Sequence, residues 1–241
     1  LPMLRSVVLA VSAALALPAA GDPTRQDVDH VPTGKGWGER PAPGNQAPAA
    51  IPKTTSNGIS YHGGPLLTTS PINVYYIWYG NWVGNSATTI LTDFMNNLAP
   101  SPWFNINSTY YDGSKAKVPN AVTLNKQIFT TEWPIGAGSG VYSTALSDTD
   151  IRNVVASAIS SNLVPTDPKG VYFVLTSQDV NATSGFCTSY CGWHTYASMS
   201  TPNGTQNIKY SFVGNAARCP NACAAQSGSS PNGNVGADAM A

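Results

Sequence analysis

The sequence contains little charge. Its 241 residues include 12 Lys and Arg against 12 Asp and Glu, so the formal net charge is zero. Many of these charges lie near the start of the chain, and residues 57–241 contain no basic patch. Proteins that bind nucleic acid neutralise its phosphates with such patches. The composition therefore argues against a nucleic-acid partner.

Long hydrophobic runs are also missing. A membrane-spanning helix needs about 20 consecutive apolar residues, whereas the apolar run at residues 7–17 is shorter and no other run is long enough. This run follows Arg5 and leads into Pro18 and small residues ending at Gly21. A charge, a short apolar region and small residues are typical of a secretory signal peptide. We therefore expect residues 1–21 to direct secretion, and we expect no membrane span.

Large apolar side chains are scarce in the segment that follows. Residues 22–56 are rich in Pro, Gly, Ala and charge. Such a segment cannot bury enough surface to offset the entropy lost on ordering, which predicts a flexible linker or propeptide. Residues 57–241 then have the length of one domain.

Histidine is scarce as well, because the chain has only His30, His62 and His194. No Ser-His-Asp set and no pair of carboxylates in a recognisable motif stands out, so the sequence predicts no catalytic residues. His62 and His194 are weak candidates for metal ligands. Asp179 follows a predicted buried strand, where ligand sites often lie in α/β sheets, but a turn-forming role is the better interpretation.

Two stretches predict buried strands. Residues 72–79 are β-branched or aromatic almost throughout, and residues 170–176 are similarly apolar. Strands that are apolar on both faces belong inside a covered sheet. By the usual right-handed crossover, we expect the two strands to run parallel.

Two helices complete the pattern. Apolar residues recur at helical spacing over residues 90–98, and Ser147 with Asp150 predicts a capping box for a second helix. Alternating strands and helices predict an α/β fold with a mixed, mainly parallel sheet and packed helices. After Ser177 the periodicity fades, so we expect an irregular segment that disulfides tie together, with one further strand candidate at residues 206–213.

The cysteines form two Cys-x-x-x-Cys pairs, Cys187 with Cys191 and Cys219 with Cys223. Because exported cysteines usually oxidise, we expect disulfides, and we favour bridges between the two pairs over bridges within each. Two alternatives remain: a zinc site that includes a nearby His, and a nucleophilic pair of Cys191 with His194.

Three sequons, at Asn107, Asn181 and Asn203, are acceptor sites for N-linked sugar. In a chain that is expected to be secreted, three sequons predict that at least one carries a glycan.

Several short blocks also carry a resemblance. In chain order they are residues 61–65, 77–82, 174–177 with 179–180, 186–187 to 191–194, 212–215, and 219–220 with 223. Together they resemble the phosphate-induced, EXORDIUM-like family of secreted proteins, best known from plants. The resemblance covers about residues 61–241. It implies a place in the apoplast, cell wall or extracellular matrix and a role in growth linked to hormones or nutrients. It implies no defined reaction.

The resemblance also bears on fold and metal. Members of the family continue, after a segment like residues 238–241, into a helix with His-Glu-Leu-x-Glu. This implies that the sequence is incomplete at both ends. Residues 236–241 themselves are typical of a loop entering a helix, and Asp is a good capping residue, so we expect Asp238 to be the cap. A sheet followed by such a helix is similar to the zincin metalloprotease layout, in which zinc would be possible in the full-length chain. However, Glu replaces the second His of the usual zincin motif, which argues against zinc and peptidase activity.

Three hypotheses follow. The first is a secreted, disulfide-bonded matrix or cell-wall glycoprotein that acts in growth or nutrient signalling without catalysis or a cofactor in residues 1–241. The second is a zincin-like metal-dependent hydrolase. The third is a wall-polysaccharide binder that uses surface aromatics. The candidates for those aromatics are Trp78, Trp82, Trp103, Trp133 and Trp193.

Overall fold

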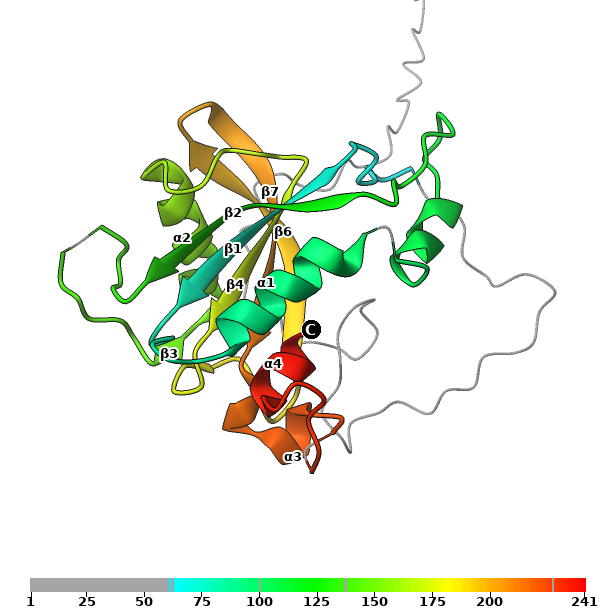
Figure 1. Ribbon diagram of the computed structural model, residues 1–241. Helices are drawn as coiled ribbons and strands as arrows, with labels where there is room; N and C mark the ends of the chain where they lie inside the picture. Colours follow the sequence, from blue (N-terminus) through cyan, green and yellow to red (C-terminus); the bar gives the residue numbers. More distant parts are fainter. Residues whose placement is uncertain (1–60, 62, 100, 137, 227) are drawn as a thin grey trace, which may run out of the picture.

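A computed structural model describes residues 61, 63–99, 101–136, 138–226 and 228–241 (Figure 1). Five strands form one sheet in the order β2–β1–β4–β7–β6. They are β1 (Ile72–Tyr79), β2 (Val122–Thr130), β4 (Val171–Thr176), β6 (Gly192–Thr201) and β7 (Gly204–Gly214). All run parallel except β6, which lies antiparallel to β7 at one edge. The predicted mixed, mainly parallel sheet is confirmed.

Two predicted regions, the signal peptide at residues 1–21 and the linker at 22–56, lie outside the described residues. None of the helices that the structure does describe is long and apolar enough to cross a membrane.

Strand β1 is an interior strand, because it pairs with β2 on one side and β4 on the other. Its alternating side chains are buried on both faces, with Ile77, Trp78 and Tyr79 each 0% exposed. The prediction of a strand covered on both faces is therefore confirmed.

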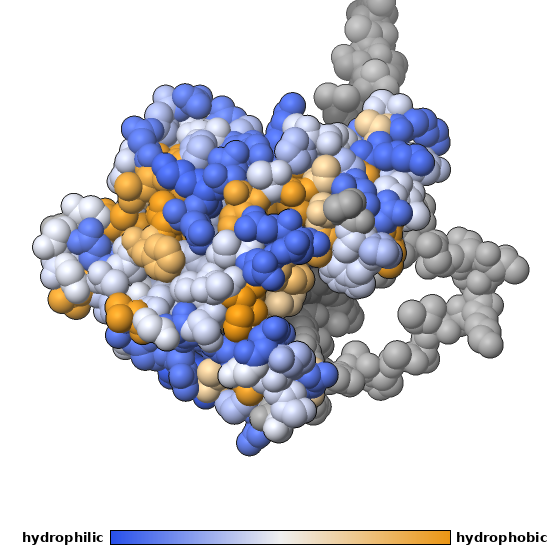
Figure 2. Space-filling model, viewed as in Figure 1, coloured by the Kyte–Doolittle hydropathy of each residue, from blue (hydrophilic) through white to orange (hydrophobic). Residues whose placement is uncertain are grey.

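One helix covers each face of the sheet, which gives three layers (Figure 1). Helix α1 (Ala87–Leu98) packs with Val74, Tyr76 and Trp78. Helix α2 (Asp148–Ser160) packs on the opposite face, in the cluster that contains the alternate side chains of β1. On the face that carries α1, hydrophobic residues are interspersed with hydrophilic ones (Figure 2).

The start of α2 matches its prediction. The Ser147 side chain accepts a hydrogen bond from the Asp150 backbone N–H, and the Asp150 carboxylate accepts one from the Ser147 N–H at 2.8 Å. This reciprocal box satisfies two backbone donors that the first helical turn leaves unpaired.

The prediction of an irregular segment after Ser177 is wrong, although its one strand candidate, residues 206–213, lies within β7. This segment contains β6 and β7, the two longest strands of the sheet. Strand β6 was not expected because its buried face alternates Trp193 with small or polar residues such as Ala197. An edge strand with such a face gives little period-2 signal.

Short elements complete the chain. They are η1 (Phe104–Thr109), β3 (Ala145–Leu146), β5 (Asn181–Ala182), η2 (Ala216–Arg218), α3 (Pro220–Cys223) and α4 (Val235–Met240). The expected cap of the last helix was Asp238, but the cap is Asn234, whose side chain accepts from Ala237 N–H at 3.0 Å. Asp238 lies inside the first turn and accepts a hydrogen bond from Asn232 N–H at 3.0 Å.

Candidate functional site

The parallel strands β1, β4 and β7 end at one edge of the sheet, and the segments that follow them surround a depression of about 850 Å³. We call it the carboxyl-edge depression. Its lining residues are Asn81, Asn85, Gln178, Asp179, Cys187, Arg218 and Cys219. In open α/β sheets, ligands bind at this edge because the loops that follow the strands converge there.

Loops after β1 and β4 are joined through Ser177, which is only 2% exposed. Its hydroxyl accepts a hydrogen bond from Asn81 N–H at 3.0 Å and donates one to Asp179 Oδ1 at 2.6 Å. The other carboxylate oxygen, Oδ2, accepts a hydrogen bond from Tyr142 OH at 2.6 Å. Asp179 therefore organises the turn, as the sequence predicted, and also lines the depression.

These contacts keep Asp179 ionised. Partial burial alone would raise the pKa of its carboxyl group, but the hydrogen bonds from Ser177 and Tyr142 and the charge of Arg218 outweigh it. The pKa of Asp179 therefore lies below its usual value. Burial and the neighbouring carboxylate raise the pKa of Tyr142, so its hydroxyl remains a hydrogen-bond donor.

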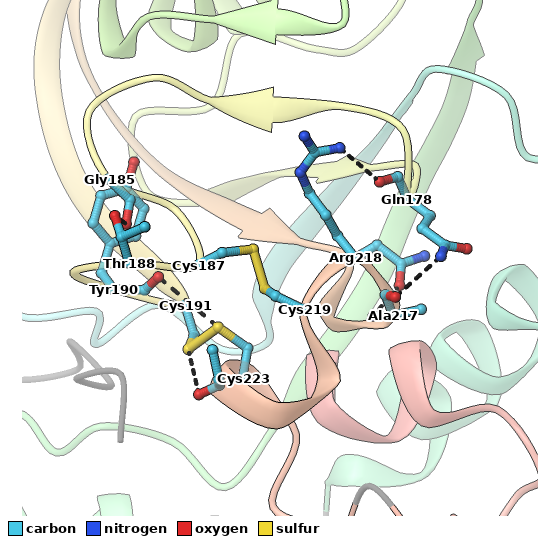
Figure 3. Close-up of a disulfide and its surroundings, with 12 residues drawn as sticks. Gln178, Gly185, Cys187, Thr188, Tyr190, Cys191, Ala217, Arg218, Cys219 and Cys223 are labelled. Carbon is cyan, nitrogen blue, oxygen red and sulfur yellow. Dashed lines mark hydrogen bonds between the residues drawn. A yellow bond between two sulfur atoms is a disulfide. The ribbon is translucent and has the colours of Figure 1, made fainter. Parts of the chain in front are cut away.

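Arg218 ties η2 to the loop after β4. One guanidinium nitrogen, Nη1, donates to the backbone carbonyls of Gln178 at 3.2 Å and Asp179 at 3.1 Å. In return, the Gln178 side chain donates to the carbonyl of Ala217 at 3.0 Å. Figure 3 shows the Arg218 side chain reaching Gln178 in this way. The guanidinium is thus held at the depression by backbone acceptors.

Two disulfides lie side by side next to Arg218 (Figure 3). They join Cys187 to Cys219 and Cys191 to Cys223, with Cα–Cα distances of 5.8 and 5.4 Å. The prediction of bridges between the two Cys-x-x-x-Cys pairs is confirmed. The Cys187–Cys219 bridge itself lines the depression.

Both alternative roles for the cysteines fail on the described residues. Sulfur atoms of Cys187, Cys219 and Cys223 lie within 4.8 Å of one another, but all are oxidised, and oxidised sulfur does not provide the thiolate that zinc requires. A nucleophilic Cys191 fails for the same reason, because it is bonded to Cys223.

Asparagine side chains link the two helices beside the depression. Asn234, the cap of α4, donates from Nδ2 to Asn85 Oδ1 and to Ser86 Oγ, both at 3.0 Å. Asn85 Oδ1 also accepts from Ala87 N–H at 3.0 Å. The start of α1 is therefore fixed relative to the start of α4.

Of the two weak metal candidates, His194 is the one that falls within the described residues. His62 lies outside the described residues. His194 is exposed on β6, opposite Ser211 of β7.

Sequons differ in accessibility. Asn203 is exposed in the turn between β6 and β7. Asn107 and Asn181 are half-buried, and the Asn107 side chain donates to the Phe104 carbonyl at 2.9 Å. Asn203 is therefore the sequon best placed to carry a glycan.

Most of the candidate surface aromatics lie in the core. Trp78, Trp82 and Trp193 are buried, Trp133 is half-buried, and Trp103 is 68% exposed. Of the five, only Trp103 offers a broad aromatic surface.

Sequence reasoning did not single out four of the lining residues, namely Asn81, Asn85, Gln178 and Arg218. Asn81 and Gln178 do follow predicted strands, as Asp179 does, and this position is a usable signal. Arg218 had no such signal, because its place depends on the disulfides and on β7. Together these groups can form directional hydrogen bonds, whereas the nearby Ser177 hydroxyl is buried.

The family model for the phosphate-induced protein 1 conserved region matches residues 59–241. The EXORDIUM-like 5 protein of Arabidopsis thaliana is 35% identical over 176 residues, which cover 69% of this chain and 46% of that protein. EXORDIUM-like 3 of the same plant is 31% identical over 205 residues, which cover 76% and 57%. The chain thus spans about half the length of these curated relatives. No solved structure matches it.

Substitution of Gly80 tests how closely the loop after β1 packs against Ser177 beside the depression. Its φ is +99°, and an added Cβ would lie 2.0 Å from Ser177 Oγ. Gly84 also has a positive φ, +70°, but a Cβ there meets nothing within 4 Å. We expect Gly84→Ala to lower the free energy of unfolding by roughly 1–2 kcal/mol, and Gly80→Ala to lower it by clearly more. Urea unfolding of both variants measures this; equal losses would contradict the close packing of Ser177.

Proposed function

Because the chain belongs to the phosphate-induced protein 1 family, together with the EXORDIUM-like proteins, we propose that it acts outside the cell in the matrix or wall. In this proposal it is a glycoprotein of growth or nutrient-linked signalling that works by binding and not by catalysis. The binding site is the carboxyl-edge depression. The ligand is a wall saccharide.

Several features support the extracellular part of the proposal. The two disulfides suit an oxidising compartment, since cytosolic proteins rarely keep such bonds. The exposed sequon at Asn203 suits passage through the secretory pathway. The sequence at residues 1–21 has the pattern of a signal peptide.

The observation that carries the binding part is the chemistry of the depression. Its lining combines the amides of Asn81, Asn85 and Gln178 with one carboxylate and one guanidinium. These planar groups suit the closely spaced hydroxyls of a sugar. Ser177 is buried and donates to Asp179, whose lowered carboxyl pKa makes it a weak base for activating a nucleophile.

Location can be tested with tagged protein expressed in a secreting eukaryotic cell. We expect the protein in the medium, carrying a glycan that a glycosidase removes and that Asn203→Gln abolishes. Asn181→Gln is the matched control and should leave the Asn203 glycan in place. Stable retention in the cytosol would overturn the extracellular proposal.

Binding can be tested on a wall-glycan array, with the chain length of bound saccharides followed by mass spectrometry. We expect binding without shortening of the saccharide. Asn81→Ala should weaken binding roughly three- to tenfold, because one neutral hydrogen bond contributes about 0.5–1.5 kcal/mol. The control is Trp103→Ala, which removes an exposed aromatic that does not line the depression.

If Trp103→Ala alone abolished binding, the saccharide would bind at an aromatic surface instead. If saccharides were shortened, the non-catalytic proposal would be wrong.

One observation favours a second candidate, the zincin-like hydrolase. Helix α4 packs against α1, with Ala237 and Met240 in the same cluster as Leu91. The resemblance expects a His-Glu helix to begin at this point of the chain. The described residues themselves do not fit a metal, because the clustered sulfurs are oxidised and His194 is exposed on β6.

We therefore predict that residues 1–241 bind no zinc tightly and hydrolyse nothing by a metal route. Elemental analysis of the purified chain, after dialysis against a weak chelator, should find well below one zinc per chain. One tightly held zinc per chain would place the ligands within these residues. His62 and His194 would then be the first positions to mutate.

A further inference from the structure

We propose that the carboxyl-edge depression selects saccharides that carry a carboxylate, and that Arg218 binds this carboxylate. This inference rests on the proposed function, because it names the class of saccharide that the same site takes. It makes Arg218 the residue that determines specificity.

The first argument is the state of the guanidinium. Arg218 directs Nη1 at two backbone carbonyls and not at a carboxylate. Its Nε and Nη2 groups donate to no residue in the described part of the chain. Because the Cys187–Cys219 bridge and the two carbonyls fix its position, the guanidinium is already ordered. A planar fork of this kind matches a carboxylate with two parallel hydrogen bonds.

The second argument is the balance of donors and acceptors. Asn81 Oδ1 accepts from Val83 N–H at 3.1 Å, and Asn85 Oδ1 accepts from Ala87 N–H and from Asn234. The side-chain oxygens are thus used within the protein. The Nδ2 groups of Asn81 and Asn85 donate to nothing among the described residues. The unused groups are therefore mainly donors, which suit a ligand rich in oxygen and negatively charged.

The carboxylate of Asp179 limits how much negative charge the ligand can carry. Its two carboxylate oxygens accept from Ser177 and Tyr142, and Arg218 donates to its backbone carbonyl and not to its carboxylate. The carboxylate stays ionised, so it repels a second negative group placed over it. We infer a ligand with one carboxylate at Arg218 and neutral hydroxyl-bearing units beyond. Gln178 Oε1 can accept from such a hydroxyl, because its amide nitrogen is bonded to Ala217.

Titration calorimetry on the whole chain tests the inference with three probes of equal length. They are an oligosaccharide that carries a single uronic acid at its end, the methyl ester of that oligosaccharide, and the neutral oligosaccharide in which a hexose replaces the uronic acid. We expect the acid to bind at least tenfold more tightly than its ester, because esterification removes the charge that the fork recognises. Raising the salt concentration should weaken binding of the acid more than that of the neutral probe.

Arg218→Gln should remove the preference for the acid over the ester. The matched control, Lys115→Gln, removes the same charge from a lysine that lies over the Tyr111 ring and does not line the depression. It should keep the preference. If Arg218→Gln unfolds, Arg218→Lys keeps the charge without the fork, and an intermediate preference is expected.

Equal binding of acid and ester by the wild-type chain would overturn this inference and leave the proposed function standing. Retention of the full preference by both Arg218 variants would also overturn it. Tighter binding of a sulfated oligosaccharide of equal length would overturn it as well, because the site would then select a sulfate and not a carboxylate. If none of these saccharides nor any glycan on the array bound, the proposed function itself would fail.

Discussion

The burial of β1 on both faces is the constraint on which the structure depends. Its side chains alternate between two apolar clusters, so a helix must cover each face. Its backbone pairs with parallel strands on both sides, and parallel pairing requires crossovers that return the chain over a face of the sheet. Helices α1 and α2 supply these covers. The carboxyl ends of β1, β4 and β7 then meet at one edge, and the loops must lie there.

Loops at this edge are fixed mainly by polar and covalent links. Gly80 allows Ser177 to approach the end of β1, and Asn234 joins the starts of α1 and α4. Arg218 joins η2 to the loop after β4, and the two disulfides join the η2–α3 region to the segment before β6. Hydrogen bonds and disulfides thus link segments that lie far apart in the sequence around the depression. Removing any of these links should affect the depression before it affects the sheet.

Sequence predicted the features that depend on local pattern. The apolar runs of β1 and β4 and the capping box of α2 are local, and each lies where it was expected. Strand β6 was missed because Trp193 and Met199 share its inner face with Thr195 and Ala197, so burial there depends on pairing with β7. The cap of α4 was misplaced because Asn234 and Asp238 are both good capping types, and only the backbone decides between them. Arg218 could not be predicted, because its position depends on contacts across about 40 residues.

The hydrogen bonds that hold the lining side chains bear on what the depression can do. A flexible arginine loses side-chain entropy when it binds an anion, at an estimated 0.5–1.5 kcal/mol per immobilised side chain. In this chain Arg218 is already held by two carbonyls, and Asn81 and Asn85 are held through their side-chain oxygens. The entropy has therefore been lost on folding, and the remaining donors face the depression in a fixed arrangement. Donors in a fixed arrangement can discriminate between ligands by the placement of their acceptors, which suits the proposed binding function and which a lone pair of charges on a mobile loop does not provide.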